Sequence, residues 1–399
     1  MPKNIVFCAD GTWNGPNSKD DDNDGIPDTT NVWKAFCTLA GDAKLDSVLL
    51  ASEQELEQTG PEAQVAKYLH GVGDSRNVAI KLLGGVFGNG IIARIVRGYT
   101  YVSRNYEPGD AIILIGFSRG AYTVRALGGM IADVGLLNPQ KFDLSDKEHA
   151  YMLGINAWRR HREARVKARQ NAGGLLGIFS ALMRHLPQFA FDTSEPDDTV
   201  PVDSIKAIGV WDTVGSLGIP LYLGANGSDV DVFRFADTAL SNKVAFGVHA
   251  LSLDEQRSDF TPTFWDARDG ITQALFAGAH ADVGGGYPTD ESGLSDIACT
   301  WMLERLGDPA IGLHVKPQPW AFKPDFFGMG HEPWTQPPFN LLPKGPRTPI
   351  PFPKDVGAHI SIAHRMGIDP KTGQRVAVTL KYLPTALAEQ LGTNMVWMD

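Results

Sequence analysis

A serine between two glycines is the residue of this sequence whose setting most directly suggests chemistry. It is Ser118, in the run Gly116-Phe117-Ser118-Arg119-Gly120. A serine hydroxyl is a weak nucleophile at neutral pH, so it needs a base that takes its proton and an acid that orients the base. Glycines, which lack Cβ atoms, let the chain close into the sharp turn that holds such a serine. The pattern predicts a nucleophile at Ser118, and a tight turn with a structural serine is the alternative.

The base is expected to be a histidine, and four histidines lie in settings worth weighing. They are His249, His280, His359 and His364. His280, in FAGAHADVGGGY, directly follows an apolar run of strand length and precedes a glycine-rich turn. That position directs its side chain to the end of a strand, where ligands of parallel sheets bind. We therefore predict that His280 is the base, with a buried histidine hydrogen-bonded to Asp282 as the alternative.

An aspartate at the end of another apolar run is the candidate for the orienting acid. It is Asp212, in VWDTVGSLG, with Asp254 and Asp282 as the other candidates. In α/β-hydrolases the triad residues follow one another in the chain in the order serine, acid, histidine. Because Ser118, Asp212 and His280 have that order, we expect them to form a catalytic triad.

Acyl transfer through a serine also requires N–H groups that stabilise the negative oxygen of the tetrahedral intermediate. One such donor is expected at the backbone of Arg119, directly after the nucleophile. A second is expected from Gly11 and Thr12, in the turn DGTWN that follows the first apolar run. Asp10 is expected to hold that turn by accepting its N–H groups.

These residues lie at or near the ends of short apolar runs, which alternate with helical patterns. The runs of strand length are residues 5–10, 47–52, 111–117, 204–212 and 271–280, and apolar residues recur at helical spacing within 90–106 and 121–137. Strands that alternate with helices form a parallel sheet covered on both faces. We predict an α/β-hydrolase-like fold, a mostly parallel sheet flanked by helices, with a lid-like insertion and an irregular proline-rich C-terminal segment.

Composition limits the class of protein. The chain has 399 residues, of which 43% are hydrophobic and 21% charged, as in soluble globular proteins. The net charge of −10 argues against nucleic acid as a partner, since a nucleic-acid binder needs a concentrated positive surface. The three cysteines fit reduced thiols better than a disulfide framework. With no long apolar run and no cleavage site after the first apolar stretch, we expect cytoplasmic synthesis without a signal peptide or transmembrane segment.

An acidic insertion near the N-terminus has the pattern of a calcium loop. In SKDDDNDGIPDTTN, residues 18–31, carboxylates alternate and a glycine follows the third. Calcium loops place side-chain oxygens at positions 1, 3 and 5, a sharp-turn glycine at 6 and a backbone carbonyl at 7. Carboxylates so close together would repel one another without a cation. A structural Ca²⁺ with no part in the chemistry is predicted, bound by Asp20, Asp22, Asp24, Ile26 and Asp28. A solvated acidic loop is the alternative, because the glutamate that usually stands at position 12 is missing.

Two further segments bear on domain organisation. Residues 1–310 are expected to form the catalytic domain, and residues 311–399 a C-terminal extension packed on it. The insertion 150–200 joins a basic helix to an apolar stretch within residues 157–189. It is expected to form a lid or a peripheral membrane contact, and an amphipathic helix packed on the domain is the alternative. Residues 314–354, rich in proline and aromatic residues, are expected to form an ordered wrap or a linker.

Several separated motifs resemble those of a known family and follow the family's order. They are FCADGTWN, GVGDS, YEPGDAIILIGFSRGAYTVRALGGMI, GVWDTVGSLG, HALSLDEQRSDFTPTFW and FAGAHADVGGGY, which cover most of residues 3–306. The sequence is similar to the uncharacterised α/β-hydrolase family that includes the type VI secretion phospholipase (lipase) effectors. The resemblance implies an esterase acting on lipid or other ester substrates, with Ser118, Asp212 and His280 in the triad positions. It also implies an immunity or secretion partner and export by a specialised secretion system.

Two classes of function stay open on the sequence. The first is a serine hydrolase that cleaves carboxylic esters through an acyl-enzyme, of lipase or phospholipase type, or an esterase or acyltransferase on non-lipid esters. The second is a non-catalytic, calcium-ordered binding module that keeps the hydrolase fold. A nucleophile, an acid and a base in triad order favour the first class, because a module without turnover needs none of the three.

Overall fold

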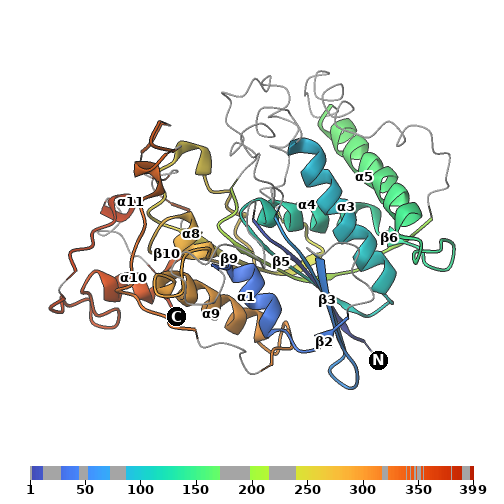
Figure 1. Ribbon diagram of the computed structural model, residues 1–399. Helices are drawn as coiled ribbons and strands as arrows, with labels where there is room; N and C mark the ends of the chain where they lie inside the picture. Colours follow the sequence, from blue (N-terminus) through green and yellow to red (C-terminus); the bar gives the residue numbers. More distant parts are fainter. Residues whose placement is uncertain are drawn as a thin grey trace.

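The structure is a computed structural model in which one large sheet runs through the molecule (Figure 1). It describes residues 2–11, 28–44, 53–71, 87–170, 198–214, 240–316, 322–337, 339–341, 343–345, 347, 352–353, 355–378, 380–388 and 396–399. From one edge to the other, the strands of the sheet are β12 (Trp397–Met398), β11 (Val356–His359), β10 (Ile271–Phe276), β9 (Val244–Ser252), β8 (Ile205–Trp211), β5 (Ala111–Phe117), β1 (Asn4–Ala9), β4 (Gln64–Leu69), β3 (Glu53–Gln58) and β2 (Asp42–Ala43).

The sheet is parallel over most of its width. Every neighbouring pair from β12 to β4 is parallel, whereas β3 pairs antiparallel with β4 and with β2. A separate antiparallel pair is formed by β6 (Leu136–Leu137) and β7 (Thr199–Val200). The carboxyl ends of the parallel strands therefore lie along one edge of the sheet, where side chains from distant parts of the chain meet.

Helices cover both faces of the sheet, because alternate residues of a strand point to opposite sides. In β1, Ile5, Phe7 and Ala9 belong to one buried cluster, whereas Val6 and Cys8 belong to another. The first cluster includes residues of α3 (Phe87–Asn105), α4 (Arg119–Val134) and α5 (Lys147–Gln170), and the second includes residues of α1 (Asn31–Thr38) and α9 (Gly293–Gly307). Figure 1 shows these two groups of helices on opposite sides of the sheet. The prediction of a mostly parallel sheet flanked by helices is confirmed.

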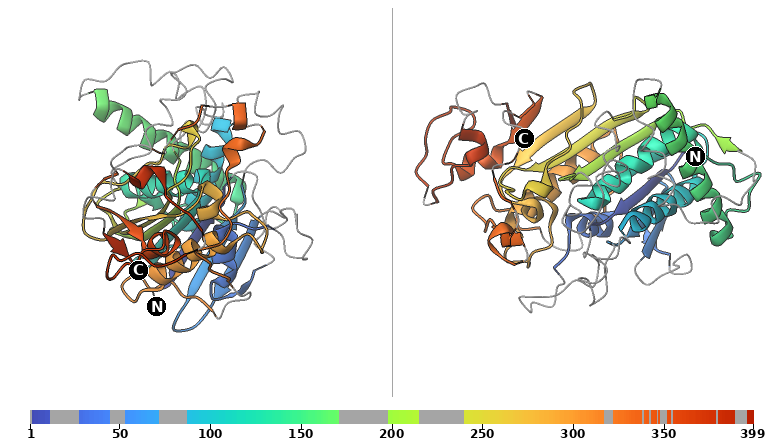
Figure 2. Two further views of the ribbon diagram at one scale, coloured as in Figure 1. Left: turned by 90° about the vertical axis from the view of Figure 1, so that its left-hand side faces the viewer. Right: turned by 90° about the horizontal axis from the view of Figure 1, so that it is seen from above.

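The remaining short helices lie in the second half of the chain. They are α8 (His280–Gly284), α10 (Ile360–Arg365), α11 (Thr385–Ala388) and the 3-10 turns η5 (Ser258–Phe260), η6 (Pro333–Thr335) and η7 (Phe339–Leu341). The C-terminal residues, orange to red in Figure 2, continue the sheet with β11 and β12 at the edge far from β2. No helix in the described ranges is long and apolar enough to cross a bilayer.

Three of the expected strands closely match observed strands, and the expected range of a fourth was too long. The runs 5–10, 111–117 and 204–212 correspond to β1, β5 and β8. The run 271–280 ends as a strand at Phe276, and His280 is the first residue of α8, so this histidine does not directly follow a strand. The expected strand 47–52 lies outside the described residues. The other strands of the large sheet, β2, β3, β4, β9, β11 and β12, were not predicted.

The insertion 150–200 is described only in part. Its first residues belong to α5, which packs against α3 and α4 through buried side chains such as Leu153, Ile155 and Trp158. Residues 171–197, with the apolar stretch of the expected lid or membrane contact, lie outside the described residues.

Candidate active site

Ser118 lies in the turn between β5 and α4, in a strained backbone conformation with φ 56° and ψ −121°. Its N–H donates to the carbonyl of Trp211 at the end of the neighbouring β8, at 3.1 Å. The flanking glycines are required by space: a Cβ at Gly116 would lie 2.5 Å from the carbonyl oxygen of Gly120, and a Cβ at Gly120 would overlap the carbonyl oxygen of Ala9. A strained serine between a strand and a helix is the geometry of a nucleophile elbow.

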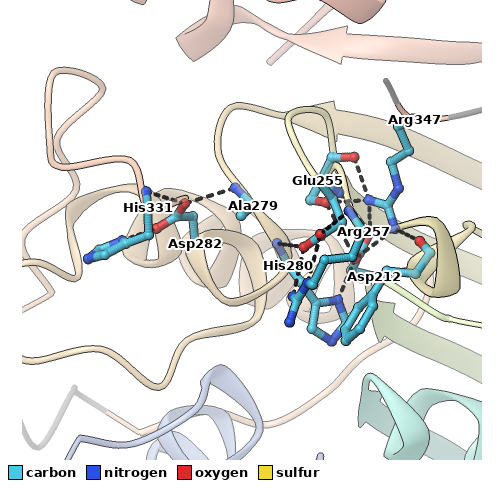
Figure 3. A network of polar contacts seen from close by, with 10 residues as sticks. Asp212, Glu255, Arg257, Ala279, His280, Asp282, His331 and Arg347 are labelled. Carbon is cyan, nitrogen blue, oxygen red and sulfur yellow. Dashed lines mark hydrogen bonds and ion pairs between the residues drawn. The ribbon is translucent and has the colours of Figure 1, made fainter. Parts of the chain in front are cut away.

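Asp212 and His280 meet at the same edge of the sheet (Figure 3). Asp212 directly follows β8, and its Oδ2 lies 2.5 Å from Nδ1 of His280. The His280 ring packs between the rings of Phe117, 4.6 Å away, and Phe260, 4.9 Å away, measured between centroids. Because Phe117 immediately precedes Ser118, this packing holds the histidine beside the serine turn. Ser118 and Asp212 are also the non-glycine residues with positive φ in the described ranges, and such strain clusters at functional sites.

The two ring nitrogens of His280 have different surroundings. Nδ1 faces the Asp212 carboxylate, whereas Nε2 is buried and has no hydrogen-bond partner within the described parts of the chain. Burial lowers the pKa of His280, and the nearby carboxylate of Asp212 offsets only part of that effect. The imidazole is therefore neutral at neutral pH, with a nitrogen that can accept a proton.

The carboxylate of Asp212 is completely buried and held by several donors. Oδ1 accepts the N–H of Ser252 at 2.8 Å and NH1 of Arg347 at 2.6 Å, and Oδ2 accepts NH2 of Arg347 at 3.0 Å. Burial alone would raise the pKa of Asp212, but the charge of Arg347 and the hydrogen bond from His280 lower it well below its ordinary value. Asp212 is thus an anion at neutral pH.

The turn before His280 is fixed by a second buried carboxylate. The backbone N–H of His280 donates to Oε2 of Glu255 at 3.2 Å, and Glu255 forms a two-pronged ion pair with Arg257, with Nε and NH2 at 2.8 Å. Gly278, with φ 102°, has no room for a Cβ because that atom would overlap the Cβ of Asp282. The position of His280 is therefore set by a hydrogen bond to a buried carboxylate and by the lack of room for a side chain at Gly278.

The other candidate histidines have different partners. His249 is buried in β9 and its Nε2 accepts the N–H of Thr213 at 3.2 Å; burial and Arg125 lower its pKa to about 3. His359 caps α10, and burial lowers its pKa to about 4. His364 packs its ring on Phe326. No hydrogen bond joins these three histidines to Asp212 within the described ranges.

The other candidate acids also bind elsewhere. Asp282 pairs with His331 at 2.6 Å and accepts the N–H of Ala279 at 2.8 Å, so it is not the partner of the His280 side chain. Asp254 accepts the N–H of Gly278 at 2.7 Å and the hydroxyl of Tyr382 at 2.6 Å. Of the three aspartates, Asp212 is the one whose carboxylate reaches the His280 ring.

The expected oxyanion donors are only partly placed. Arg119 is the first residue of α4 and directly follows Ser118. The N–H of Gly11 donates to Oδ1 of Asp10 at 2.6 Å, so Gly11 must be removed from the set of donors that face the site. Thr12 lies outside the described residues. Asp10 also accepts the hydroxyl of Tyr68 at 2.6 Å, which ties the end of β1 to β4.

The predicted calcium loop lies almost entirely outside the described residues. This holds for Asp20, Asp22, Asp24 and Ile26, whereas Asp28 is described and is 7% exposed. Within the described ranges, no three acidic, histidine or cysteine side chains form a group that could hold a metal ion. The calcium site stays a prediction.

Sequence reasoning missed the residues that contact the candidate triad. Arg347 is a single arginine in the proline-rich tail, 4% exposed, and nothing in its local sequence distinguishes it from a surface cation. Glu255 and Phe260 lie in HALSLDEQRSDFTPTFW, one of the motifs that resemble the family, so a signal for them was present. Ser252, in the same motif, supplies a backbone donor that sequence cannot reveal.

A comparison with protein families gives a match over most of the chain. Residues 3–305 match the model of a family described as type VI secretion system, phospholipase effector Tle1-like, catalytic domain. An uncharacterized protein of Saccharomyces cerevisiae is 28% identical over 271 residues, which make up 65% of this chain and 32% of that protein. The chain thus spans about a third of the length of this yeast relative.

Two solved structures show a more distant similarity. One is an uncharacterized protein from Pseudomonas aeruginosa, with 17% identity, a TM-score of 0.37 and coverage of 79% of this chain and 46% of that one. The other is the Tle1 effector bound to the VgrG spike of the type VI secretion system, with 15% identity, a TM-score of 0.34 and coverage of 72% and 52%.

Proposed function

The chain belongs to the family of the Tle1-like phospholipase effector catalytic domains of type VI secretion, and we propose that it is a serine hydrolase that cleaves carboxylic esters of lipids. The observation that carries the proposal is the meeting of three features at one sheet edge. Ser118 occupies a strained elbow after β5, Asp212 follows the adjacent β8, and His280 joins Asp212 while its ring packs beside the elbow.

The proposed reaction runs through an acyl-enzyme. Ser118 Oγ attacks the ester carbonyl as Nε2 of His280 takes its proton, and the backbone N–H of Arg119 stabilises the negative oxygen. His280 then gives this proton to the leaving alcohol, and a water molecule, activated by the same nitrogen, releases the acid from Ser118. The buried anion of Asp212 stabilises the imidazolium that forms in each half of the reaction.

Apolar side chains beside His280 support a lipid as the substrate. Phe260 contacts the His280 ring, and Phe339 lies 6.3 Å from Phe260 between ring centroids. Leu341, in the same 3-10 turn as Phe339, is 86% exposed. The guanidinium of Arg257 lies over the rings of Phe260 and Phe339, at 3.6 and 4.5 Å from their centroids, so a cation stands beside these apolar groups. Apolar surface near the base favours an acyl chain by about 25 cal/mol for each Å² that it buries.

The family description also supports a route out of the cell. Its members are named as effectors of type VI secretion, and the solved Tle1 effector is bound to the VgrG spike. We propose that this chain is likewise exported by such a system and has a secretion partner there.

A panel of esters tests the proposed activity. The panel contains vesicles of phosphatidylethanolamine and phosphatidylglycerol, a triacylglycerol emulsion and short p-nitrophenyl esters, with products identified by mass spectrometry. We expect release of fatty acid from the lipids, and a loss of at least about 10³-fold in Ser118→Ala and in His280→Ala. Ser145→Ala and His364→Ala, which change an exposed serine and a histidine of α10, serve as matched controls.

The outcomes separate the two parts of the proposal. Cleavage of the short esters alone would overturn the assignment of lipids but keep the hydrolase. Absence of any cleavage, or full activity in folded Ser118→Ala, would overturn the hydrolase itself.

A further inference from the structure

We propose that Arg347 is a positioning residue for the acid of the triad. By donating hydrogen bonds to both oxygens of Asp212, it fixes the position of the oxygen that faces His280. The proposal rests on the function proposed above, since it assigns a role in the same site. Figure 3 shows Arg347 and His280 contacting the same carboxylate from different elements.

The contact is a fork on a carboxylate. NH1 of Arg347 lies 2.6 Å from Oδ1 and NH2 lies 3.0 Å from Oδ2 of Asp212. Two parallel N–H bonds to one carboxylate define its plane as well as its place, which a single point charge does not. NH1 also contacts the hydroxyl of Ser252.

The guanidinium is itself held by backbone carbonyl groups, whose positions do not depend on side-chain rotation. NH1 donates to the carbonyl of Ser252 at 2.6 Å, and NH2 donates to the carbonyl of Phe260 at 2.7 Å. Ser252 ends β9, and Phe260 belongs to the turn whose ring contacts His280. Arg347 therefore connects the end of β9 with the carbonyl of Phe260, whose ring contacts His280.

Each oxygen of Asp212 has its own set of partners. Oδ1 accepts the N–H of Ser252 and NH1 of Arg347. Oδ2 faces Nδ1 of His280 at 2.5 Å and also accepts NH2 of Arg347 and the hydroxyl of Ser252, at 3.0 and 3.4 Å. Rotation of the carboxylate about its bond to Cβ would break the fork and the histidine contact at once. Without Arg347, the carboxylate would lose two of the donors that set this rotation, and His280 would lose its fixed orientation.

The positive charge of Arg347 also acts on the proton affinity of the Asp212–His280 pair. A cation bound to the carboxylate reduces the stabilisation that Asp212 gives to the imidazolium. The other charged or titratable groups around the pair are Arg257 and Glu255 after β9, His249 on β9 and Arg125 on α4. All of these stay when Arg347 is changed, so a shift in the titration of His280 reports the loss of Arg347.

Arg347 comes from a part of the chain that the family match does not cover. The match ends at residue 305, and Arg347 belongs to the C-terminal extension. The extension thus completes the site in addition to covering the edge of the sheet.

Two substitutions separate the charge of Arg347 from its geometry. Arg347→Gln removes the charge, and Arg347→Lys keeps a charge but loses the fork. We expect kcat/KM on a p-nitrophenyl ester to fall about 100-fold in both, as for other losses of alignment. In Arg347→Gln alone, the acidic limb of the pH profile should move up by about one pH unit, because a cation that opposed protonation is gone.

A buried arginine of the same extension is the matched control. Arg365, 6% exposed, donates through NH1 to the carbonyls of Phe326 and Gly328 at 2.7 and 2.8 Å. Arg365→Gln should lower the melting temperature without moving the acidic limb. An unmoved limb and full kcat/KM in folded Arg347→Gln, or an equal shift in Arg365→Gln, overturns the proposal.

A double-substitution cycle with Asp212→Asn tests whether Arg347 acts through Asp212. We expect Arg347→Gln to cost less than about threefold in the Asp212→Asn background, since residues that act as a unit are not additive. The same factor in both backgrounds would overturn the proposal. This double variant removes both buried charges together, so it gives a folded comparison if Arg347→Gln alone does not fold.

NMR titration of the His280 ring separates this proposal from the function on which it rests. A higher pKa of His280 in Arg347→Gln, absent in Arg365→Gln, supports the contact without any turnover. If wild-type protein cleaves no ester, the proposed function fails while the titration still reports on Arg347; if wild-type protein is active and neither kcat/KM nor the titration changes in Arg347→Gln, the positioning role alone fails.

Discussion

Replacing Asp212 by asparagine keeps the shape of the side chain and changes which atoms it offers. The asparagine must place one oxygen and one NH₂ group where the carboxylate had two oxygens. Oδ1 faces two donors, the N–H of Ser252 at 2.8 Å and NH1 of Arg347 at 2.6 Å. The Oδ2 side also faces NH2 of Arg347, at 3.0 Å, and Nδ1 of His280. The amide oxygen will take the Oδ1 side, because both donors there are fixed, whereas Nδ1 of His280 can become an acceptor when the ring proton moves to Nε2. The NH₂ group is then left against Nδ1 of His280.

An N–H donor opposite Nδ1 selects the wrong form of the histidine. Nδ1 must then accept, so the ring proton moves to Nε2, which can no longer take the proton of Ser118. Loss of the acid in a serine triad by this route costs about 10⁴-fold in kcat, or about 5.4 kcal/mol of transition-state stabilisation at about 1.36 kcal/mol per tenfold. We expect Asp212→Asn to lose about 10³- to 10⁴-fold in kcat/KM on a p-nitrophenyl ester.

The same substitution also affects folding, and the assay must separate the two effects. Arg347 is left buried beside a neutral partner, and breaking a buried ion pair costs about 3–5 kcal/mol. Urea unfolding and near-ultraviolet circular dichroism, measured at the assay temperature, give the folded fraction that normalises the rate. A normalised kcat/KM within about tenfold of wild type would refute the reasoning about the tautomer, whatever the change in stability.

Three further predictions concern the elbow, the acid stability and the metal. Gly120→Ala places a methyl group on the carbonyl oxygen of Ala9, so we expect a loss of at least about 1–3 kcal/mol in urea unfolding; wild-type stability would contradict the packing of the elbow. The pKa of His249 is lowered to about 3 in the native protein, from about 6.5 in the unfolded chain. Between these two pH values, His249 is therefore protonated in the unfolded chain and neutral in the native protein. His249 should therefore contribute a fall in stability of about 1.4 kcal/mol per pH unit on acidification through that window, and His249→Gln should reduce the slope by that amount; equal slopes in wild type and His249→Gln between about pH 6 and about pH 5 would show the reasoning to be wrong. Chelation of Ca²⁺ should lower the melting temperature, by the equivalent of about 2.7 kcal/mol when free calcium is one hundred times its dissociation constant. Asp22→Ala combined with Asp24→Ala should abolish that response, and indifference of the wild-type protein to chelator would leave only a solvated acidic loop.

The elements that position the candidate site residues could be predicted because their sequence signals are local. The elbow shows in five consecutive residues. β5 is apolar throughout and β8 is apolar except for Lys206, because both faces of a parallel strand are covered. The strand β4 was missed because it buries polar residues: Lys67 pairs with Glu53 and Glu55, and Gln64 donates to the carbonyl of Ala40. The charges of such ion pairs neutralise one another in the fold, but in the sequence the same polar residues are typical of a surface segment.

The choice among partners could not be predicted, because it depends on contacts between distant parts of the chain. Asp282 lies two residues from His280 yet pairs with His331, whereas Asp212 is reached only because β8 ends beside α8. Arg347 reaches Asp212 across 135 positions of sequence, from the C-terminal extension. The N–H of Gly11 was misassigned because the carboxylate of the preceding aspartate takes it.

Covalent labelling with a fluorophosphonate probe tests the central claim, that Ser118 is a nucleophile activated by His280. The probe is applied to wild-type protein, His280→Ala and His364→Ala, and the labelled peptide is identified by mass spectrometry. The account predicts one adduct on Ser118 in wild type and in His364→Ala, and no adduct in folded His280→Ala. An adduct on another residue, or equal labelling of Ser118 in His280→Ala, would contradict it.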